Sequence, residues 1–199
     1  ETKAVIFKPK TINQNNYVRT IIKNDITLCT GPAGCGKTAV AVGLACSWLR
    51  EGKINRIIIT RPIVETGRKG LGFLPGSLQE KVHPYMIPIL EEMYKYFCPI
   101  TVSNMVHQDI IEVSPLEYMR GRNFHNCFMI LDEAQNATYE QLKMFSTRIG
   151  QDSKCVINGD VKQTDLNYND NDFQFFIDKL VNVEGIGLAK LDRTDILRN

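Results

Sequence analysis

The chain has 199 residues, of which 43% are hydrophobic and 23% are charged, and its formal net charge is +2. This composition excludes a disordered chain, and the length predicts one domain over residues 1–199 with a core of its own. The charge is too small to indicate nucleic-acid binding by itself, and no apolar run reaches the length of a membrane span, so we expect no membrane partner.

The first informative segment is a polar run at residues 11–17, T-I-N-Q-N-N-Y, which precedes the first predicted strand. An amide such as Gln14 can pair with both a donor and an acceptor on an adenine edge. A surface position is the alternative for this glutamine. For Tyr17 we expect packing rather than stacking on a base.

A phosphate-binding loop follows, framed by a predicted strand at Ile26–Thr30 and a predicted buried helix at residues 38–50. Its sequence fits the pattern G-x-x-x-x-G-K-[ST]. The loop consists of Gly31, Pro32, Ala33, Gly34, Cys35, Gly36, Lys37 and Thr38. The glycines let successive N–H groups point at phosphate oxygens, and the helix N-terminus adds its dipole. We therefore expect Lys37 to reach the phosphates of ATP or ADP, and the Thr38 hydroxyl to bind Mg²⁺.

Residues 50–76 combine a predicted strand, Arg56–Thr60, with a basic stretch and a glycine-rich segment. Residues 65–76 contain four glycines and one proline, which predicts a long loop. Long ordered loops in compact domains are often functional. A local basic stripe can contact phosphates, although a solvated charged face explains the same charges.

The next predicted elements are a helix at residues 78–97, a strand at Ile110–Val113, a helix at 115–121 and a strand at Cys127–Asp132. The last strand is a continuous apolar run that ends in Asp132, followed by Glu133. An acid at this strand tip can hold Mg²⁺, and the next carboxylate can orient or deprotonate the attacking water. We therefore predict a metal role for Asp132 and a catalytic role for Glu133, against the alternative of a surface acid pair.

A helix at residues 138–149 begins with a predicted capping box of Thr138 and Gln141. A strand at Cys155–Asn158, a helix at 171–182 and a strand at Ile186–Leu191 complete the chain. The polar segment after Asn158 contains Gln163, which can face the γ-phosphate, since ligands gather beyond the carboxyl ends of parallel strands. A simple Gly-Asp turn is the alternative.

Alternating strands and helices predict an α/β fold with a mostly parallel sheet and helices on both faces. The six cysteines form no C-x-x-C pair, and Cys29, Cys127 and Cys155 fall in predicted buried strands. This usage is typical of reduced cysteines, and we expect a cytoplasmic protein rather than a disulfide framework or a zinc site.

Several motifs together resemble the PhoH family of phosphate-loop ATPases. They are T-x-x-Q-x-x-Y, G-P-A-G-C-G-K-T, T-R-P, G-x-L-P-G, Y-M-R-G-R, I-L-D-E-A-Q-N and N-G-D-x-x-Q, and they run from about Thr11 to Arg198. The resemblance implies a RecA-like P-loop NTPase fold, similar to the first RecA-like domain of superfamily 1 helicases. It also implies that Gln14 reads adenine and that Gln163 senses the γ-phosphate.

The same resemblance implies that Arg198, in the segment D-I-L-R, acts in a neighbouring subunit as an arginine finger. Cys35 stands where the family usually has threonine. Only the backbone N–H of this position is needed, so we expect little loss. No nuclease domain is recognisable in the sequence, and we expect no nuclease activity.

The resemblance to helicases implies action on RNA or another single-stranded nucleic acid. Candidate contacts are Arg61, Arg68, Lys69, Arg120 and Arg122. Since a helicase closes two RecA-like domains over ATP, one domain predicts a homo-oligomer, for example a hexamer. The alternative is a nucleotide-dependent switch that binds a partner such as a separate ribonuclease. A small-molecule kinase is a third reading, for which no substrate lid is recognisable.

Overall fold

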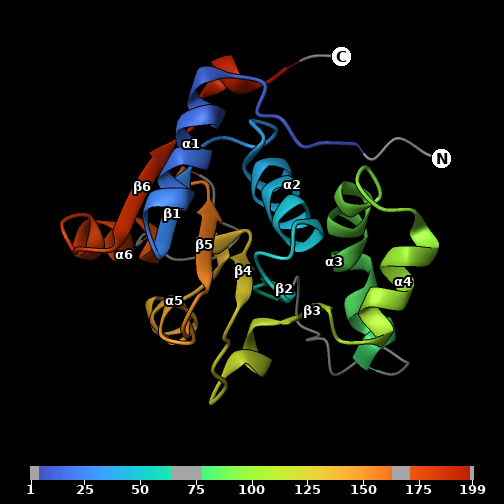
Figure 1. Cartoon of the computed structure of the whole chain (residues 1–199). Coiled ribbons are helices and arrows are strands. Elements are labelled where there is room, and N and C mark those ends of the chain that lie inside the picture. Colours follow the sequence, from blue (N-terminus) through green and yellow to red (C-terminus); the bar gives the residue numbers. More distant parts are fainter. Residues whose placement is uncertain (1–4, 64–77, 163–170, 198–199) are drawn as a thin grey trace.

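The computed structural model describes residues 5–63, 78–162 and 171–197 (Figure 1). Its strands are β1 (Ile26–Thr30), β2 (Arg56–Arg61), β3 (Ile111–Pro115), β4 (Cys127–Leu131), β5 (Lys154–Gly159) and β6 (Ile186–Lys190). Its α-helices are α1 (Ile12–Lys23), α2 (Lys37–Arg50), α3 (Leu78–Met93), α4 (Pro99–His107), α5 (Tyr139–Ser146) and α6 (Asp172–Leu180). Short 3₁₀ turns are η2 (Leu116–Met119), η3 (Ala134–Asn136) and η4 (Arg193–Asp195).

The described strands form one sheet in the order β3-β2-β4-β5-β1-β6, and every neighbouring pair is parallel. The register places Thr30 of β1 opposite Gly159 of β5 and Lys190 of β6. The carboxyl ends of the strands therefore meet at one edge. Every residue of β4 is buried, as expected for a strand covered on both faces. The predicted α/β fold with a parallel sheet is confirmed.

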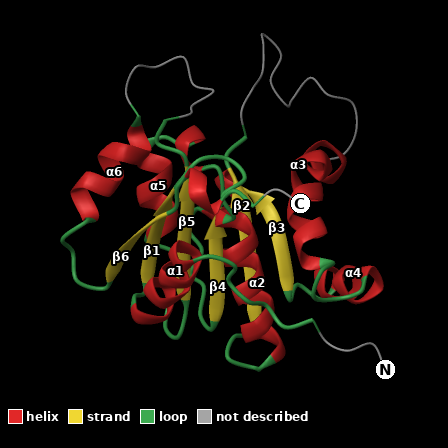
Figure 2. Cartoon of the chain, turned by 90° about the horizontal axis from the view of Figure 1, so that it is seen from above, coloured by secondary structure: helices red, strands yellow, loops and turns green. Residues whose placement is uncertain are grey.

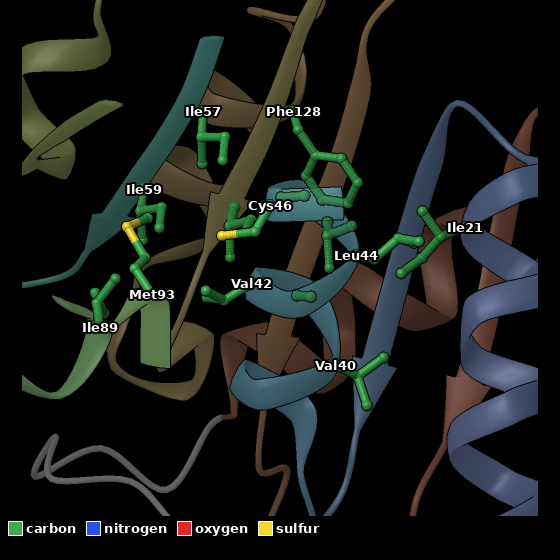
Figure 3. Packing of buried hydrophobic residues seen from close by; sticks show 14 of the residues in the cluster. Ile21, Val40, Val42, Leu44, Cys46, Ile57, Ile59, Ile89, Met93 and Phe128 are labelled. Carbon is green, nitrogen blue, oxygen red and sulfur yellow. The ribbon is translucent and has the colours of Figure 1, made fainter. Parts of the chain in front are cut away.

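Two hydrophobic clusters cover the two faces of the sheet. Alternation along β2 sends Ile57 and Ile59 into the cluster with α1, α2 and α3, and Ile58 into the cluster with α5 and α6. Figure 2 shows α1 and α2 lying across one face of the strands. In Figure 3 the apolar side of α2 packs on β2 and β4, with Cys46 near Ile57 and Phe128. This packing fixes the start of α2 relative to the strand ends.

Each of the six predicted strands matches an observed strand to within two residues at either end. The helix predictions were less accurate. The polar run 11–17 lies largely in α1, and the predicted helix 78–97 ends at Met93, before a separate helix that begins at Pro99. Proline suits the first turn of a helix, because its missing N–H has no partner there. The predicted helix 115–121 is the short 3₁₀ turn η2, whereas the capping box of Thr138 and Gln141 is confirmed.

Within the described ranges, no helix combines the length and the apolarity that crossing a membrane requires. All six cysteines are free thiols, and five of them, including Cys29, Cys127 and Cys155, are buried. The cysteines therefore serve mainly as small core residues.

Candidate nucleotide-binding site

The phosphate-binding loop connects the carboxyl end of β1 to the first residue of α2. Gly34 and Gly36 have φ angles of 79° and 97°, which side chains disfavour, and Gly36 is the N-cap residue of α2. No acidic residue lies in the first turn of this helix. The free N–H groups and the positive end of the helix dipole therefore face the loop, which is the arrangement that binds phosphate.

The ammonium group of Lys37 binds carbonyl oxygens of the phosphate-binding loop. Its Nζ donates hydrogen bonds to the carbonyl oxygens of Gly31 and Pro32, at 2.6 and 2.8 Å. The buried Cys35 Sγ lies 3.8 Å from the same ammonium group. Burial raises the pKa of the Cys35 thiol, although the Lys37 ammonium opposes the shift. The loop thus carries a positive charge at its centre and no negative side chain, which suits an anionic ligand.

Asp132 follows β4 and lies beside the start of α2. Its Oδ1 accepts a hydrogen bond from the Thr38 hydroxyl at 2.9 Å, and its Oδ2 accepts from Arg61 Nη2 at 2.7 Å and Nε at 3.1 Å. The Asp132 residue is only 1% exposed. A buried carboxylate next to a hydroxyl offers two hard oxygen ligands, which fit Mg²⁺. Arg61 neutralises the carboxylate in this structure.

The described residues contain no group of three or more His, Cys, Asp or Glu side chains that could hold a metal ion by themselves. Magnesium is usually bound by only one or two protein carboxylates, with phosphate oxygens and water completing the shell. Thr38 and Asp132 therefore fit a metal bound together with a nucleotide.

Glu133 directly follows Asp132 at the edge of the sheet. It is exposed, and its backbone adopts the left-handed region with a φ of 57°. Gln135 Nε2 donates a hydrogen bond to Glu133 Oε2 at 2.6 Å. The sequence analysis singled out the two carboxylates but missed Gln135, although the motif I-L-D-E-A-Q-N contains it.

One side of α1 contacts the site through Gln14 and Tyr17. The sequence analysis assigned Gln14 to adenine and Tyr17 to packing, but it predicted no helix here because it treated this segment as a polar run. Thr11 caps the helix by accepting a hydrogen bond from the Gln14 N–H. Gln14 donates to the Cys35 carbonyl at 3.1 Å and accepts from the Lys10 N–H at 2.9 Å. The Tyr17 hydroxyl donates to the Asn158 side chain at the end of β5. Spacing of three residues places these side chains on one helix face.

The turn η4 lies next to the start of α1, at the top of Figure 1, and Asp195 connects the two. Its carboxylate accepts hydrogen bonds from the Thr11 hydroxyl at 2.5 Å, from Asn13 Nδ2 at 3.0 Å and from the Asp192 N–H at 2.8 Å. Burial alone raises the pKa of this carboxyl, but the three hydrogen bonds outweigh burial and lower it. The segment that leads to Arg198 is therefore fixed to the start of α1.

The candidate nucleic-acid residues lie in different environments. Arg61 is bound to Asp132 and borders a small pocket that Pro62, Tyr85 and Pro115 also line. Arg122 donates hydrogen bonds to both oxygens of Glu112 at 2.6 and 2.8 Å, and this contact is the largest cause that lowers the pKa of the Glu112 carboxyl.

Among the remaining candidates, Arg120 is exposed. Gln163, Arg68, Lys69 and Arg198 lie outside the described residues, as does the glycine-rich segment at residues 65–76. Their predicted roles stay predictions.

Comparison with known proteins places this site in a family. The sequence model described as "PhoH-like protein" matches residues 6–199. A PhoH-like protein from Synechocystis is 45% identical over 99% of this chain and 60% of its own length. A PhoH-like protein from Mycobacterium tuberculosis is 44% identical over 96% of this chain and 54% of its own length. Protein PhoH from Escherichia coli K12 is 39% identical over 77% of this chain and 44% of its own length. The chain thus spans about half the length of these curated relatives.

Solved structures show the same fold at low sequence identity. The Sulfolobus solfataricus SWI2/SNF2 ATPase core in complex with dsDNA matches 80% of this chain and 33% of its own, with 13% identity and a TM-score of 0.50. The DUF1998 helicase MrfA bound to DNA matches 92% of this chain and 26% of its own, with 10% identity and a TM-score of 0.54. The fold is therefore that of the RecA-like domains of P-loop NTPases.

Proposed function

Because this chain belongs to the PhoH family and has the fold of a P-loop NTPase, we propose that it binds ATP with Mg²⁺ and hydrolyses it. One observation carries the proposal: the positive loop around Lys37 faces the same sheet edge as the buried pair of Thr38 and Asp132. Phosphoryl transfer depends on such positioning and charge neutralisation rather than on covalent chemistry.

Each residue of this edge has a role in the proposal. Lys37 and the loop N–H groups bind the phosphates, and Thr38 and Asp132 hold Mg²⁺. The bound metal neutralises charge on the phosphate oxygens. Glu133 accepts a proton from the attacking water, Gln163 contacts the γ-phosphate and Gln14 recognises adenine. The amide of Gln14 is already anchored to the loop through the Cys35 carbonyl, so adenine recognition uses its remaining hydrogen and lone pair.

Two variants test the site. Lys37→Ala should lower ATP affinity or turnover strongly, and Glu133→Gln should retain ATP but hydrolyse it at least about 100-fold more slowly, as expected for a general base. Phosphate release measures turnover, and a fluorescent ATP analogue measures affinity. Unchanged kinetics in Lys37→Ala would refute the assignment of the site.

We further propose that ATP hydrolysis drives action on RNA or another single-stranded nucleic acid. Arg120, exposed beside η2, and the basic residues Arg68 and Lys69 supply sequence-independent phosphate contacts. In this proposal the protein works as a cytoplasmic homo-oligomer, for example a hexamer, in which Arg198 completes the site of the next subunit. The hydrogen bond of Asp195 to Thr11 fixes the backbone of η4, shortly before Arg198.

A nucleotide-dependent switch is the second candidate, and one observation favours it. Arg61 and Arg122, two candidate nucleic-acid residues, are both engaged in ion pairs within the chain. In this reading ATP changes the assembly state, and the protein binds a partner such as a ribonuclease. Phosphate release with and without single-stranded RNA separates the two candidates, because a motor is strongly stimulated and a switch is not. Sedimentation with an ATP analogue and Mg²⁺ tests the oligomer, and a strict monomer with full activity would exclude it.

A further inference from the structure

Gln135 lies in η3, between the two strand ends that carry Glu133 and Asp160. It is 7% exposed, and its amide forms hydrogen bonds toward both strands. Nε2 donates to Glu133 Oε2 at 2.6 Å, and Oε1 accepts from the Asp160 N–H at 3.0 Å. The first bond ends on a carboxylate, so it is charge-assisted and stronger than a bond between neutral groups.

Glu133 needs such a partner because its own surroundings restrain it weakly. Its side chain is exposed, and its backbone has a φ of 57°, a conformation that only a surrounding structure maintains in a residue with a side chain. The Asn136 N–H donates to the Glu133 carbonyl at 3.0 Å, which fixes the backbone but not the carboxylate. The hydrogen bond from Gln135 therefore selects the direction in which the carboxylate points.

The position of Gln135 is in turn fixed by the end of β5. A Cβ atom added to Gly159 would lie 3.1 Å from the Gln135 backbone nitrogen and 2.6 Å from Phe173 Cε1, so strand and turn are in close contact. The Gly159 carbonyl accepts a hydrogen bond from the Gly31 N–H at 3.2 Å, at the start of the phosphate loop. A continuous path thus runs from the loop through Gly159, Asp160 and Gln135 to Glu133.

We propose that Gln135 is a positioning residue, which holds the Glu133 carboxylate in a fixed place relative to the phosphate loop. The inference rests on the proposed function, in which Glu133 acts on the attacking water. Because the bond joins Gln135 to the base and not to the loop interior, its loss reduces turnover and leaves ATP binding intact. A displacement of about 1 Å at a reacting group is worth about 100-fold in rate.

Two variants test the hydrogen bonds of the amide to Glu133 and Asp160. Gln135→Met keeps the approximate volume and removes both of these bonds. Gln135→Glu keeps an acceptor for the Asp160 N–H but places a second carboxylate against Glu133, and like charges disfavour this contact. We expect kcat to fall about 10- to 100-fold in Gln135→Met and further in Gln135→Glu, with KM for ATP and the affinity for a fluorescent ATP analogue unchanged within about twofold.

Gln151 provides the matched control, since it is exposed before β5, at the opposite edge of the sheet. Gln151→Met and Gln151→Glu should retain the wild-type kcat. Urea unfolding of all variants separates misfolding from a kinetic effect, because a folded variant still unfolds in one cooperative transition. A folded Gln135→Met protein with wild-type kcat would overturn the inference.

A double-mutant cycle with Glu133→Gln distinguishes the two proposals. If Gln135 acts through Glu133, then Gln135→Met has no further effect on the residual rate of Glu133→Gln. A further loss by the same factor as in the wild type would show that Gln135 acts elsewhere, and the inference fails while the proposed function stands. A Glu133→Gln protein with wild-type turnover would instead refute the role of Glu133, and the inference with it.

Discussion

Replacement of Thr11 by valine removes the hydroxyl group that connects the start of α1 with Asp195 of η4. The hydroxyl accepts from the Gln14 N–H at 3.1 Å as the N-cap of α1, and it donates to Asp195 at 2.5 Å. An N-cap contributes about 1 kcal/mol, and a hydrogen bond to a charged group contributes about 1.5–3 kcal/mol. Since Asp195 is only 1% exposed, solvent does not replace the lost donor. We therefore expect the free energy of unfolding to fall by about 2–4 kcal/mol.

The loss should also depend on pH. Hydrogen bonds lower the pKa of Asp195 in the folded chain, in spite of its burial. A carboxyl whose pKa is lowered by folding stabilises the folded state above its unfolded pKa, about 3.9, and this contribution disappears as the pH falls through the folded pKa. The difference between the wild type and Thr11→Val should therefore be complete near pH 7 and should shrink below about pH 4.

Urea unfolding followed by circular dichroism measures both effects. An unchanged m-value and a midpoint lowered by about 1–2 M indicate a loss of folded-state stability. Thr11→Ser is the matched control, because serine keeps the hydroxyl and is an equally good N-cap. If Thr11→Val unfolds within about 0.5 kcal/mol of the wild type at pH 7, the hydroxyl does not connect α1 with η4 as described.

Three further predictions follow from other parts of the site and the surface. Gly36→Ala places a methyl group 2.6 Å from the side-chain nitrogen of Gln14, so it should weaken ATP binding and destabilise the fold. Gly52→Ala is the control with a smaller expected effect, because its φ is also positive but its Cβ meets nothing within 4 Å. ATP titration and urea unfolding measure the two effects. Arg61→Ala leaves the buried Asp132 carboxylate without its cation, so urea unfolding should show a loss of about 2–4 kcal/mol, and Arg61→Lys should recover part of it. With Ellman's reagent, Cys98 should react first, because it is the exposed thiol and a hydrogen bond to a nearby threonine lowers its pKa; Cys98→Ser should remove this fast phase.

The sequence predicted the sheet better than the helices, for a physical reason. Strands such as β4 are continuous apolar runs, because helices cover both faces of a parallel sheet. In contrast, α1 carries few apolar residues, and one of them, Ile12, is 81% exposed, so the helix was hard to recognise from an apolar pattern. The usable signal was the N-cap Thr11 followed by polar side chains at a spacing of three residues, with Tyr17 buried.

The candidate site was likewise predictable from the sequence only in part. The loop from Gly31 to Thr38 could be predicted, because its chemistry depends on residue types at fixed local spacing. The ion pair of Arg61 with Asp132 could not, since it joins two strand ends that are 71 residues apart and become neighbours only through the order of the strands. The resemblance to helicases likewise made Arg122 a candidate nucleic-acid contact, although the fold brings it to Glu112.

Arg61 occupies a position where it would compete with the proposed Mg²⁺ for the carboxylate of Asp132. Its guanidinium group holds the buried carboxylate of Asp132, and the same residue borders the small pocket beyond β2 and β3. Mg²⁺ and a guanidinium group both require this carboxylate, so binding of the metal weakens the ion pair and frees positive charge toward the pocket. The metal affinity of the proposed site is therefore linked to the ion pair of Arg61 with Asp132.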